Sequence, residues 1–171
     1  DQMLDMGFVN DVKKIVKLTP DNRQTLLFSA TMPIAIRELA EMFLKDPASV
    51  TVTPVSSTAE KVEQRLYFVE KGEKRNLLYH LIRNEKLHDV LVFSRTKHGA
   101  DNVVKSLRKK GVAAEAIHGD KSQNARQRVL DAFKSKEVGV LVATDIAARG
   151  IDIDLLPYVI NFDLPNIPET Y

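Results

Sequence analysis

Apolar residues along the chain alternate between a helical spacing and short uninterrupted runs. Near the N-terminus Phe8, Val12, Ile15 and Val16 recur at intervals of three and four, which places them on one face of a helix. The same spacing predicts further helices around residues 36–44, 77–82, 100–107 and 125–133. The chain is therefore expected to contain several amphipathic helices, each with one face for a core.

Short apolar runs between these helices predict strands. They cover residues 24–28, 48–52, 62–69, 89–93, 112–117, 138–143 and 158–162. The run at 24–28 is expected to be buried, and those at 89–93 and 138–143 lack polar alternation, as strands covered on both faces do. Strands that alternate with helices predict an α/β fold, with a parallel sheet and helices on both of its faces.

One polar segment interrupts this pattern. Residues 53–59 read Thr-Pro-Val-Ser-Ser-Thr-Ala, which are small, mostly polar and marked by a proline. We therefore predict one structural unit at 1–53, a linker at 54–61 and a second domain at 62–171.

Composition narrows the class of protein. The chain has no cysteine, which excludes disulfides, thiolate zinc sites and cysteine nucleophiles. No apolar run approaches the roughly 18 residues that suggest a transmembrane helix, so no membrane partner is expected. The first residues also lack the basic and apolar regions of a signal peptide. These features fit a cytoplasmic protein, the location that we expect.

Charge is distributed unevenly although the net charge is only +2. Residues 95–136 contain 11 Lys and Arg against 4 Asp and Glu, whereas residues 137–171 contain one Arg against 6 acids. A basic block of this kind suggests a local anionic partner, for which nucleic acid is the common case. The alternative is a solvated helical face.

Polar residues follow several of the predicted strands. They lie at 29–31, 94–97, 118–122 and 144–152. Loops at the carboxyl ends of parallel strands share one edge of a sheet, where ligands bind in open α/β folds. Hydroxyls, backbone near glycine, Arg and Lys suit phosphate oxygens. Thr31, Thr96 and Ser122 could instead serve only as helix N-caps, but four such loops together favour an anion-binding edge.

Several segments form an ordered set of motifs. Residues 1–8 resemble the segment that follows an Asp-Glu-Ala-Asp box, with Asp1 as its last residue. Residues 29–31 are a Ser-Ala-Thr triplet, 90–96 resemble helicase motif IV, and 142–152 resemble motif V. Gln123 and Arg126 match the Gln-x-x-Arg element. This set of motifs spans essentially the whole chain and resembles the DEAD-box RNA helicase family. The motif sequences are most similar to those of its bacterial members.

The resemblance implies a fold and a role for individual residues. It implies a second RecA-like helicase domain, preceded by the carboxyl-terminal part of a first. Ser29 and Thr31 would couple the two domains, Asp145 would help to hold their closed interface, and Gly150 and Asp152 would face the ATP ribose. The residues expected to face the RNA backbone are Arg95, Thr96, Gly119, Gln123, Arg126 and Thr144.

Elementary chemistry is compatible with several of these roles. Gln123 and Arg126 are three residues apart and share a helix face, and Gly119 allows backbone to approach a phosphate. A carboxylate such as Asp152 can accept a hydrogen bond from a ribose hydroxyl. The alternatives are that Asp152 is a turn residue and that Arg126 forms only a pair within its helix. His118, at a strand end, is interpreted as structural.

The family's activity is ATP-dependent RNA unwinding: RNA-stimulated ATP hydrolysis, with ATP and Mg²⁺ as cofactors, coupled to local duplex separation and remodelling of RNA–protein complexes. The chain has no Gly-x-x-x-x-Gly-Lys-[Ser/Thr] loop, no metal ligands are assigned within it, and the final arginine motif would begin after Tyr171. We therefore expect a fragment that alone hydrolyses ATP no faster than buffer. The alternatives are a RecA-like scaffold that binds RNA or protein without hydrolysis, and a DNA translocase.

Overall fold

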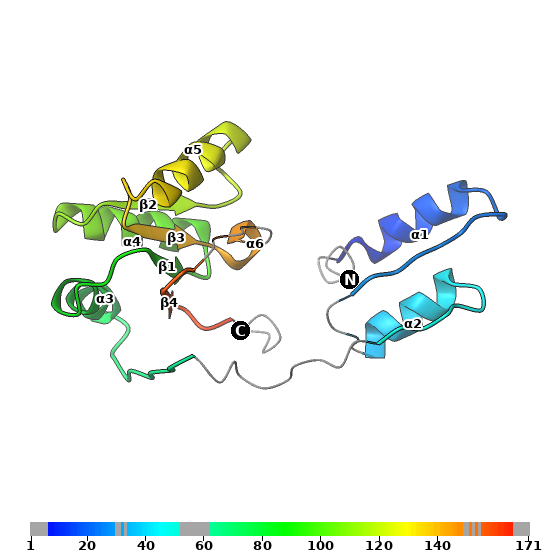
Figure 1. Ribbon diagram of the computed structural model, residues 1–171, viewed down its shortest axis with the longest axis horizontal. Coiled ribbons are helices and arrows are strands. Elements are labelled where there is room, and N and C mark those ends of the chain that lie inside the picture. The colour runs from blue at the N-terminus through cyan, green and yellow to red at the C-terminus, as the bar shows by residue number, and fades with distance from the viewer. Residues whose placement is uncertain are drawn as a thin grey trace. The chain divides into compact units, whose positions relative to one another are not determined.

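The computed structural model describes residues 7–29, 32, 34–51, 62–148, 151, 153 and 155–165. The chain divides into two compact units, Asp1–Glu63 and Gln64–Tyr171. Figure 1 shows the helices and strands of each unit.

The first unit contains two helices, α1 (Val9–Leu18) and α2 (Ile34–Phe43), which confirms the helices predicted there. Among the described residues of this unit, the buried apolar side chains all come from α2, namely Ile36, Leu39 and Ala40. Helix α1 buries none of its residues, and Ile15 and Leu18 are exposed. The apolar face of α1 is therefore not buried against a core in the described part of the chain.

The prediction of a buried strand at 24–28 is wrong. These residues form no strand, and the side chains of Leu26 and Phe28 are 62% and 82% exposed. A strand exists only when its backbone N–H and C=O groups pair with a neighbour. None of the strands in the described residues lies beside 24–28, so its backbone groups have no strand there to pair with.

Two further predicted strands are also wrong, for the same reason. Residues 48–51 and 62–69 form no strand, and Val50 and Phe68 are 89% and 93% exposed. Both segments are rich in residues that favour strands, but in the described chain neither has a sheet edge to join.

The second unit is built on a parallel sheet. Its strands are β1 (Val90–Phe93), β2 (Ala114–Ile117), β3 (Val140–Ala143) and β4 (Tyr158–Asn161). They lie in the order β2-β3-β1-β4, and every pair is parallel. The predicted strands around 89–93, 112–117, 138–143 and 158–162 are therefore confirmed, with slightly shorter bounds.

Four helices pack on this sheet: α3 (Lys74–Asn84), α4 (Lys97–Lys109), α5 (Gln123–Lys134) and the short α6 (Asp145–Ala148). Three of them were predicted, and α6 was not. Alternate strand residues point to opposite faces. Val90 and Val92 share one core with α3 and α4, whereas Leu91 lies in a second core with Phe133 of α5. The expected α/β architecture, with helices on both faces of the sheet, is confirmed (Figure 1).

Helix α4 ends in a way that sends the chain into β2. Gly111 has φ of +77°, a conformation that glycine adopts without steric cost. The N–H of Val112 then donates to the carbonyl of Leu107 at 3.0 Å, a helix-terminating bond of the Schellman type. This turn lets β2 begin beside β3 three residues after Gly111.

None of the helices in the described parts of the chain has both the length and the apolar composition needed to cross a bilayer.

Leu107→Ala should destabilise the second unit by about 2–5 kcal/mol, because it leaves a cavity in a core where Leu107 is 1% exposed. Leu66→Ala is the matched control, since Leu66 is 71% exposed, and it should change the free energy of unfolding by less than about 0.5 kcal/mol. Chemical denaturation followed by circular dichroism measures both. Equal losses in the two variants would contradict the assigned core.

Candidate nucleic-acid interface

The strand register brings the polar turns of the second unit to one edge. Phe93, Ala143 and Asn161 occupy equivalent positions, and Ile117 pairs with Ala143. Because all four strands are parallel, the turns that follow them emerge together. The expectation that residues 94–97, 118–122 and the start of 144–152 share an edge is confirmed for the described residues. We call this edge, with the turns at 94–97, 118–122, 144–148 and 162–165, the carboxyl edge.

Backbone hydrogen bonds tie the turns to neighbouring strands. The N–H of Ser94 donates to the carbonyl of Ala143 at 2.9 Å, and the N–H of Thr144 donates to the carbonyl of Ile117 at 3.3 Å. Each turn is therefore anchored to the strand beside it before its side chains are considered.

The turn after β1 is packed around a glycine. Thr96 is the N-cap of α4, and its Oγ1 accepts from the N–H of Gly99 at 3.0 Å. A Cβ on Gly99 would lie 2.7 Å from Ser94 Oγ and 2.9 Å from Thr96 Oγ1, closer than any ordinary contact. The sequence prediction that Thr96 caps a helix is confirmed, and Gly99 is needed because the two hydroxyls approach it so closely.

Arg95 is held at both its backbone and its side chain. Its N–H donates to Asp163 Oδ2 at 3.1 Å, and its guanidinium Nη2 donates to the carbonyl of Leu164 at 3.1 Å. Arg95 nevertheless belongs to the exposed surface of the edge, and its guanidinium has further N–H groups that can donate to an anion.

The turn after β2 is fastened to α4 by charged pairs. Lys97 Nζ lies 2.8 Å from Asp120 Oδ2, and Asp101 Oδ1 lies 3.1 Å from Nε2 of the buried His118 and 3.5 Å from Lys121 Nζ. Burial raises the pKa of Asp101. The hydrogen bond and charge of His118, together with Lys121, lower the pKa by more than burial raises it, so the pKa lies below its ordinary value. The ionised Asp101 can only accept, which makes His118 the donor and supports its structural interpretation.

Gly119 lies between these fastened residues and is itself exposed. A Cβ added to it would meet no atom within 4 Å. Its backbone is therefore open to a ligand, in a turn whose flanking residues His118 and Asp120 are both held by α4.

The start of α5 brings the Gln-x-x-Arg pair to the same edge. Ser122 caps the helix, with its Oγ accepting from the N–H of Ala125 at 3.3 Å, as the sequence predicted. Arg126 donates to Gln123 Oε1 at 3.3 Å and to the carbonyl of Ala147, in α6, at 3.2 Å. Arg126 therefore does not only form a pair within its own helix, because it also links α5 to α6.

The turn after β3 becomes helix α6. The carbonyl of Thr144 accepts from the N–H groups of Ala147 and Ala148, both at 2.9 Å, and Asp145 lies in the first turn of the helix, where a negative charge is favoured by the helix dipole. Both Thr144 and Asp145 are half-buried. They follow β3 directly, and the carbonyl of Ala147 in α6 accepts from Arg126 of α5.

Most of the remaining predicted residues are not described by the structure. Ser29 is half-buried in the first unit. Thr31, Gly150 and Asp152 lie outside the described residues, as does Asp1. Among the residues that the structure does describe, no three His, Asp or Glu side chains cluster in a way that could hold a metal ion. Gly150 and Asp152, the two residues predicted to face the ATP ribose, are thus not among those whose geometry is described.

Sequence reasoning missed Asp163, which lies just past β4. Its carboxylate accepts from Arg95 N–H, from Ser94 Oγ at 3.3 Å and from Lys74 Nζ at 2.7 Å. The rule that singled out the residues after the other strands would have found it, because Asp163 follows a predicted strand by one residue.

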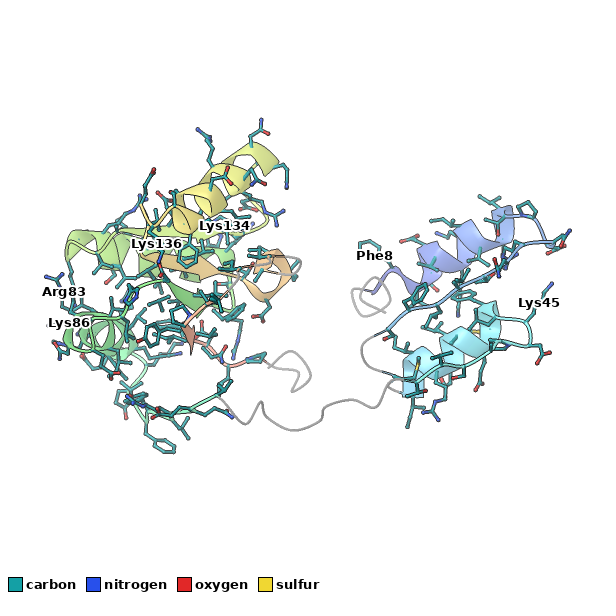
Figure 2. The ribbon with its side chains drawn as sticks, in the orientation of Figure 1. Phe8, Lys45, Arg83, Lys86, Lys134 and Lys136 are labelled. Atoms are coloured by element: carbon teal, nitrogen blue, oxygen red, sulfur yellow. The ribbon has the colours of Figure 1, made fainter. Side chains whose placement is uncertain are left out.

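The basic block of the sequence maps only partly to the carboxyl edge. Arg108 lies at the far end of α4 and donates to the carbonyl of Ala114, where β2 begins. Lys136, labelled in Figure 2, pairs with Asp89 just before β1 at 3.2 Å. These cations lie at the amino ends of the strands, because each helix runs back across the sheet. The charge count therefore overstates the positive charge of the candidate interface.

Comparison with known proteins identifies the family. A model of the helicase conserved C-terminal domain matches residues 73–171, and one of the DEAD/DEAH box helicases matches residues 1–39. The chain belongs to the DEAD-box helicase family. The resemblance seen in the sequence motifs is confirmed, and with it the RecA-like class of the sheet.

Relatives in this family are longer than the chain. It is 45% identical over 172 residues to the RNA helicase CrhR of Synechocystis, covering 100% of the chain and 35% of that protein. A DEAD box protein from Methanococcus jannaschii superimposes with a TM-score of 0.63 at 39% identity, over 100% of the chain and 46% of that structure. Dbp5 of S. cerevisiae bound to RNA and ADP BeF3 gives a TM-score of 0.79 at 25% identity, over 94% and 41%. The chain thus spans about a third of the curated relative's length.

Asp163→Asn should weaken the second unit in a pH-dependent way. Burial raises the pKa of Asp163, but the hydrogen bonds from Lys74, Arg95 and Ser94 and the charge of Lys74 outweigh it, so the pKa falls below 3.8. A carboxyl with a lowered native pKa stabilises the fold fully above its unfolded value and loses that effect as pH falls through the native value.

The difference in free energy of unfolding between wild type and Asp163→Asn should therefore be greatest above about pH 4–5 and should shrink as the solution is made more acidic. Urea denaturation at a series of pH values measures it. A difference that stays constant down to pH 2 would show that the charge of Asp163 has no stabilising role.

Proposed function

We propose that the second unit binds the sugar–phosphate backbone of RNA along its carboxyl edge, as part of an ATP-dependent RNA helicase. The main support is the convergence of the turns at 94–97, 118–122 and 144–148 on one side of a parallel sheet. This edge offers backbone N–H groups, hydroxyls and the guanidinium of Arg95, all of which are donors suited to phosphate oxygens.

The residues proposed to face RNA are those of the sequence prediction: Arg95, Thr96, Gly119, Gln123, Arg126 and Thr144. Arg95, Thr96, Gly119 and Gln123 are exposed, and Arg126 and Thr144 are half-buried. The relatives named as RNA helicases and the related Dbp5, whose structure was determined with RNA and ADP BeF3, favour RNA over DNA as the ligand.

Activity is proposed for the whole protein in which such a chain works. Ser29 and Thr31 would couple the nucleotide to the RNA, Asp145 would hold the closed interface, and Gly150 and Asp152 would face the ribose of ATP. Mg²⁺–ATP, when bound, would supply the phosphoanhydride bond whose cleavage by water transfers the γ-phosphoryl group. The groups of this chain contribute binding and orientation of the two ligands.

A scaffold without hydrolysis is the competing function. It predicts RNA binding that is indifferent to ATP, whereas a helicase predicts phosphate release that RNA accelerates. Measuring RNA-stimulated phosphate release by the whole protein distinguishes the two, and release that single-stranded RNA leaves unchanged would support the scaffold.

Gly119→Ala should weaken RNA binding without weakening the fold. The new methyl group meets no protein atom within 4 Å, so the free energy of unfolding should change little. It would stand in the space where a phosphate meets backbone N–H, and losing one such hydrogen bond costs about 1 kcal/mol, roughly a fivefold rise in Kd.

Gly139→Ala is the matched control, because a Cβ there also meets nothing within 4 Å but lies just before β3, at the opposite end of the sheet. Fluorescence anisotropy of a labelled single-stranded RNA, repeated at several salt concentrations, measures Kd for the wild type and both variants. Equal affinities in all three would place the RNA away from the turn at 118–122.

A further inference from the structure

A single carboxylate joins three parts of the second unit at the carboxyl edge. Asp163 Oδ1 accepts from Lys74 Nζ, on the first turn of α3, at 2.7 Å. Asp163 Oδ2 accepts from Ser94 Oγ at 3.3 Å and from the N–H of Arg95 at 3.1 Å. The turn after β4 is thereby tied both to α3 and to the turn after β1.

The surroundings of this carboxylate keep it in place. Ser94 is fully buried, and the side chains of Lys74 and Asp163 are only 26% and 27% exposed. The ammonium of Lys74 also lies 4.5 Å from the centre of the Phe162 ring, a cation–π contact. Lys74 is therefore located by two neighbouring residues of the same turn, and an ion pair so shielded is screened less by salt than an exposed one.

The same turn holds the side chain of Arg95. The guanidinium Nη2 of Arg95 donates to the carbonyl of Leu164, the residue after Asp163. The backbone and the side chain of Arg95 are thus fixed by two consecutive residues of another loop, which limits the rotamers that this long side chain can adopt before it meets a ligand.

We propose that Asp163, held by Lys74, is a positioning residue that presents Arg95 to the RNA backbone. It acts through Arg95 and makes no contact with RNA itself. This inference rests on the proposed function, because it gives Asp163 a role in RNA binding that a purely structural ion pair would lack. A side chain fixed in its binding geometry loses less entropy on association, so the pair should tighten binding beyond its effect on stability.

The chain offers a matched control at the other end of the sheet. Asp89 precedes β1 and pairs with Lys136 at 3.2 Å, with the Asp89 side chain 19% exposed. Like Asp163 it is a shielded aspartate paired with a lysine. It lies at the amino ends of the strands, away from Arg95, so Asp89→Asn tests what the loss of such a pair does without a link to the candidate interface.

The test is a double-mutant cycle in RNA binding, measured by anisotropy on the wild-type chain, Arg95→Ala, Asp163→Asn and the double variant. Arg95→Ala and Asp163→Asn should each raise Kd by roughly fivefold, the effect of one charge-assisted hydrogen bond or of its misplacement. The double variant should bind no more weakly than Arg95→Ala alone, because Asp163 has no other route to the RNA. Asp89→Asn should leave Kd unchanged.

Two results would overturn the inference. The first is additivity, with Asp163→Asn weakening binding equally in the wild-type and Arg95→Ala backgrounds. The second is a similar loss of affinity in Asp89→Asn, which would reduce Asp163 to a general contributor to stability. The proposed function fails separately, if the wild-type chain and Arg95→Ala bind RNA equally weakly at low salt. In that event an NMR measurement still decides whether Asp163 positions the turn. The chemical shift of the Arg95 amide should change in Asp163→Asn but not in Asp89→Asn.

Discussion

The parallel, in-register pairing of four short strands is the constraint on which the second unit depends. The order β2-β3-β1-β4 requires every connection to cross back over the sheet, and the helices that do so cover both of its faces. The same pairing fixes which residues emerge side by side at the carboxyl edge. Core and interface are therefore consequences of one register, and a slip by one residue would exchange the two faces of a strand.

Helix caps and charged pairs hold the turns of the carboxyl edge in place. Caps at Thr96 and Ser122 order the starts of two helices, and carboxylates at Asp101, Asp120 and Asp163 tie the turns to α4 and α3. These carboxylates use lysine, histidine and backbone N–H groups as internal partners. Consequently these three acids do not simply repel an anion, because their charge is balanced by neighbouring donors.

Sequence patterns predicted the second unit well because its strands and their partners lie in the same stretch of chain. The uninterrupted apolar runs around Leu91 and Leu141 identified strands buried on both faces, and both lie at the centre of the sheet. The segments at 24–28 and 62–69 also contain several apolar, strand-favouring residues but form no strand. Composition shows that a segment favours burial in a sheet, but the presence of a partner is a non-local property that periodicity cannot supply.

The candidate site shows the same division between local and non-local information. The helix caps were predictable because an N-cap acts on residues two or three positions away. The link between Asp163 and Arg95 joins residues 68 positions apart and becomes visible only once β4 is known to lie beside β1. Counting charge along the sequence failed for a related reason, since Arg108 and Lys136 are near in sequence to the edge residues but lie at the opposite ends of the strands.

The arrangement of donors also limits what the carboxyl edge can recognise. Backbone N–H groups, capping hydroxyls and a guanidinium that is already held by Leu164 suit the regular spacing of phosphates and sugars, which carries no sequence information. Phe162 is an aromatic residue in the described turns of this edge, but its ring is half-buried and already contacts the ammonium of Lys74, so it is not a free platform for the base stacking that sequence-tolerant single-strand binders commonly use. Discrimination among RNAs by this edge would therefore depend on backbone shape, and any preference for particular bases must arise from groups outside the turns described.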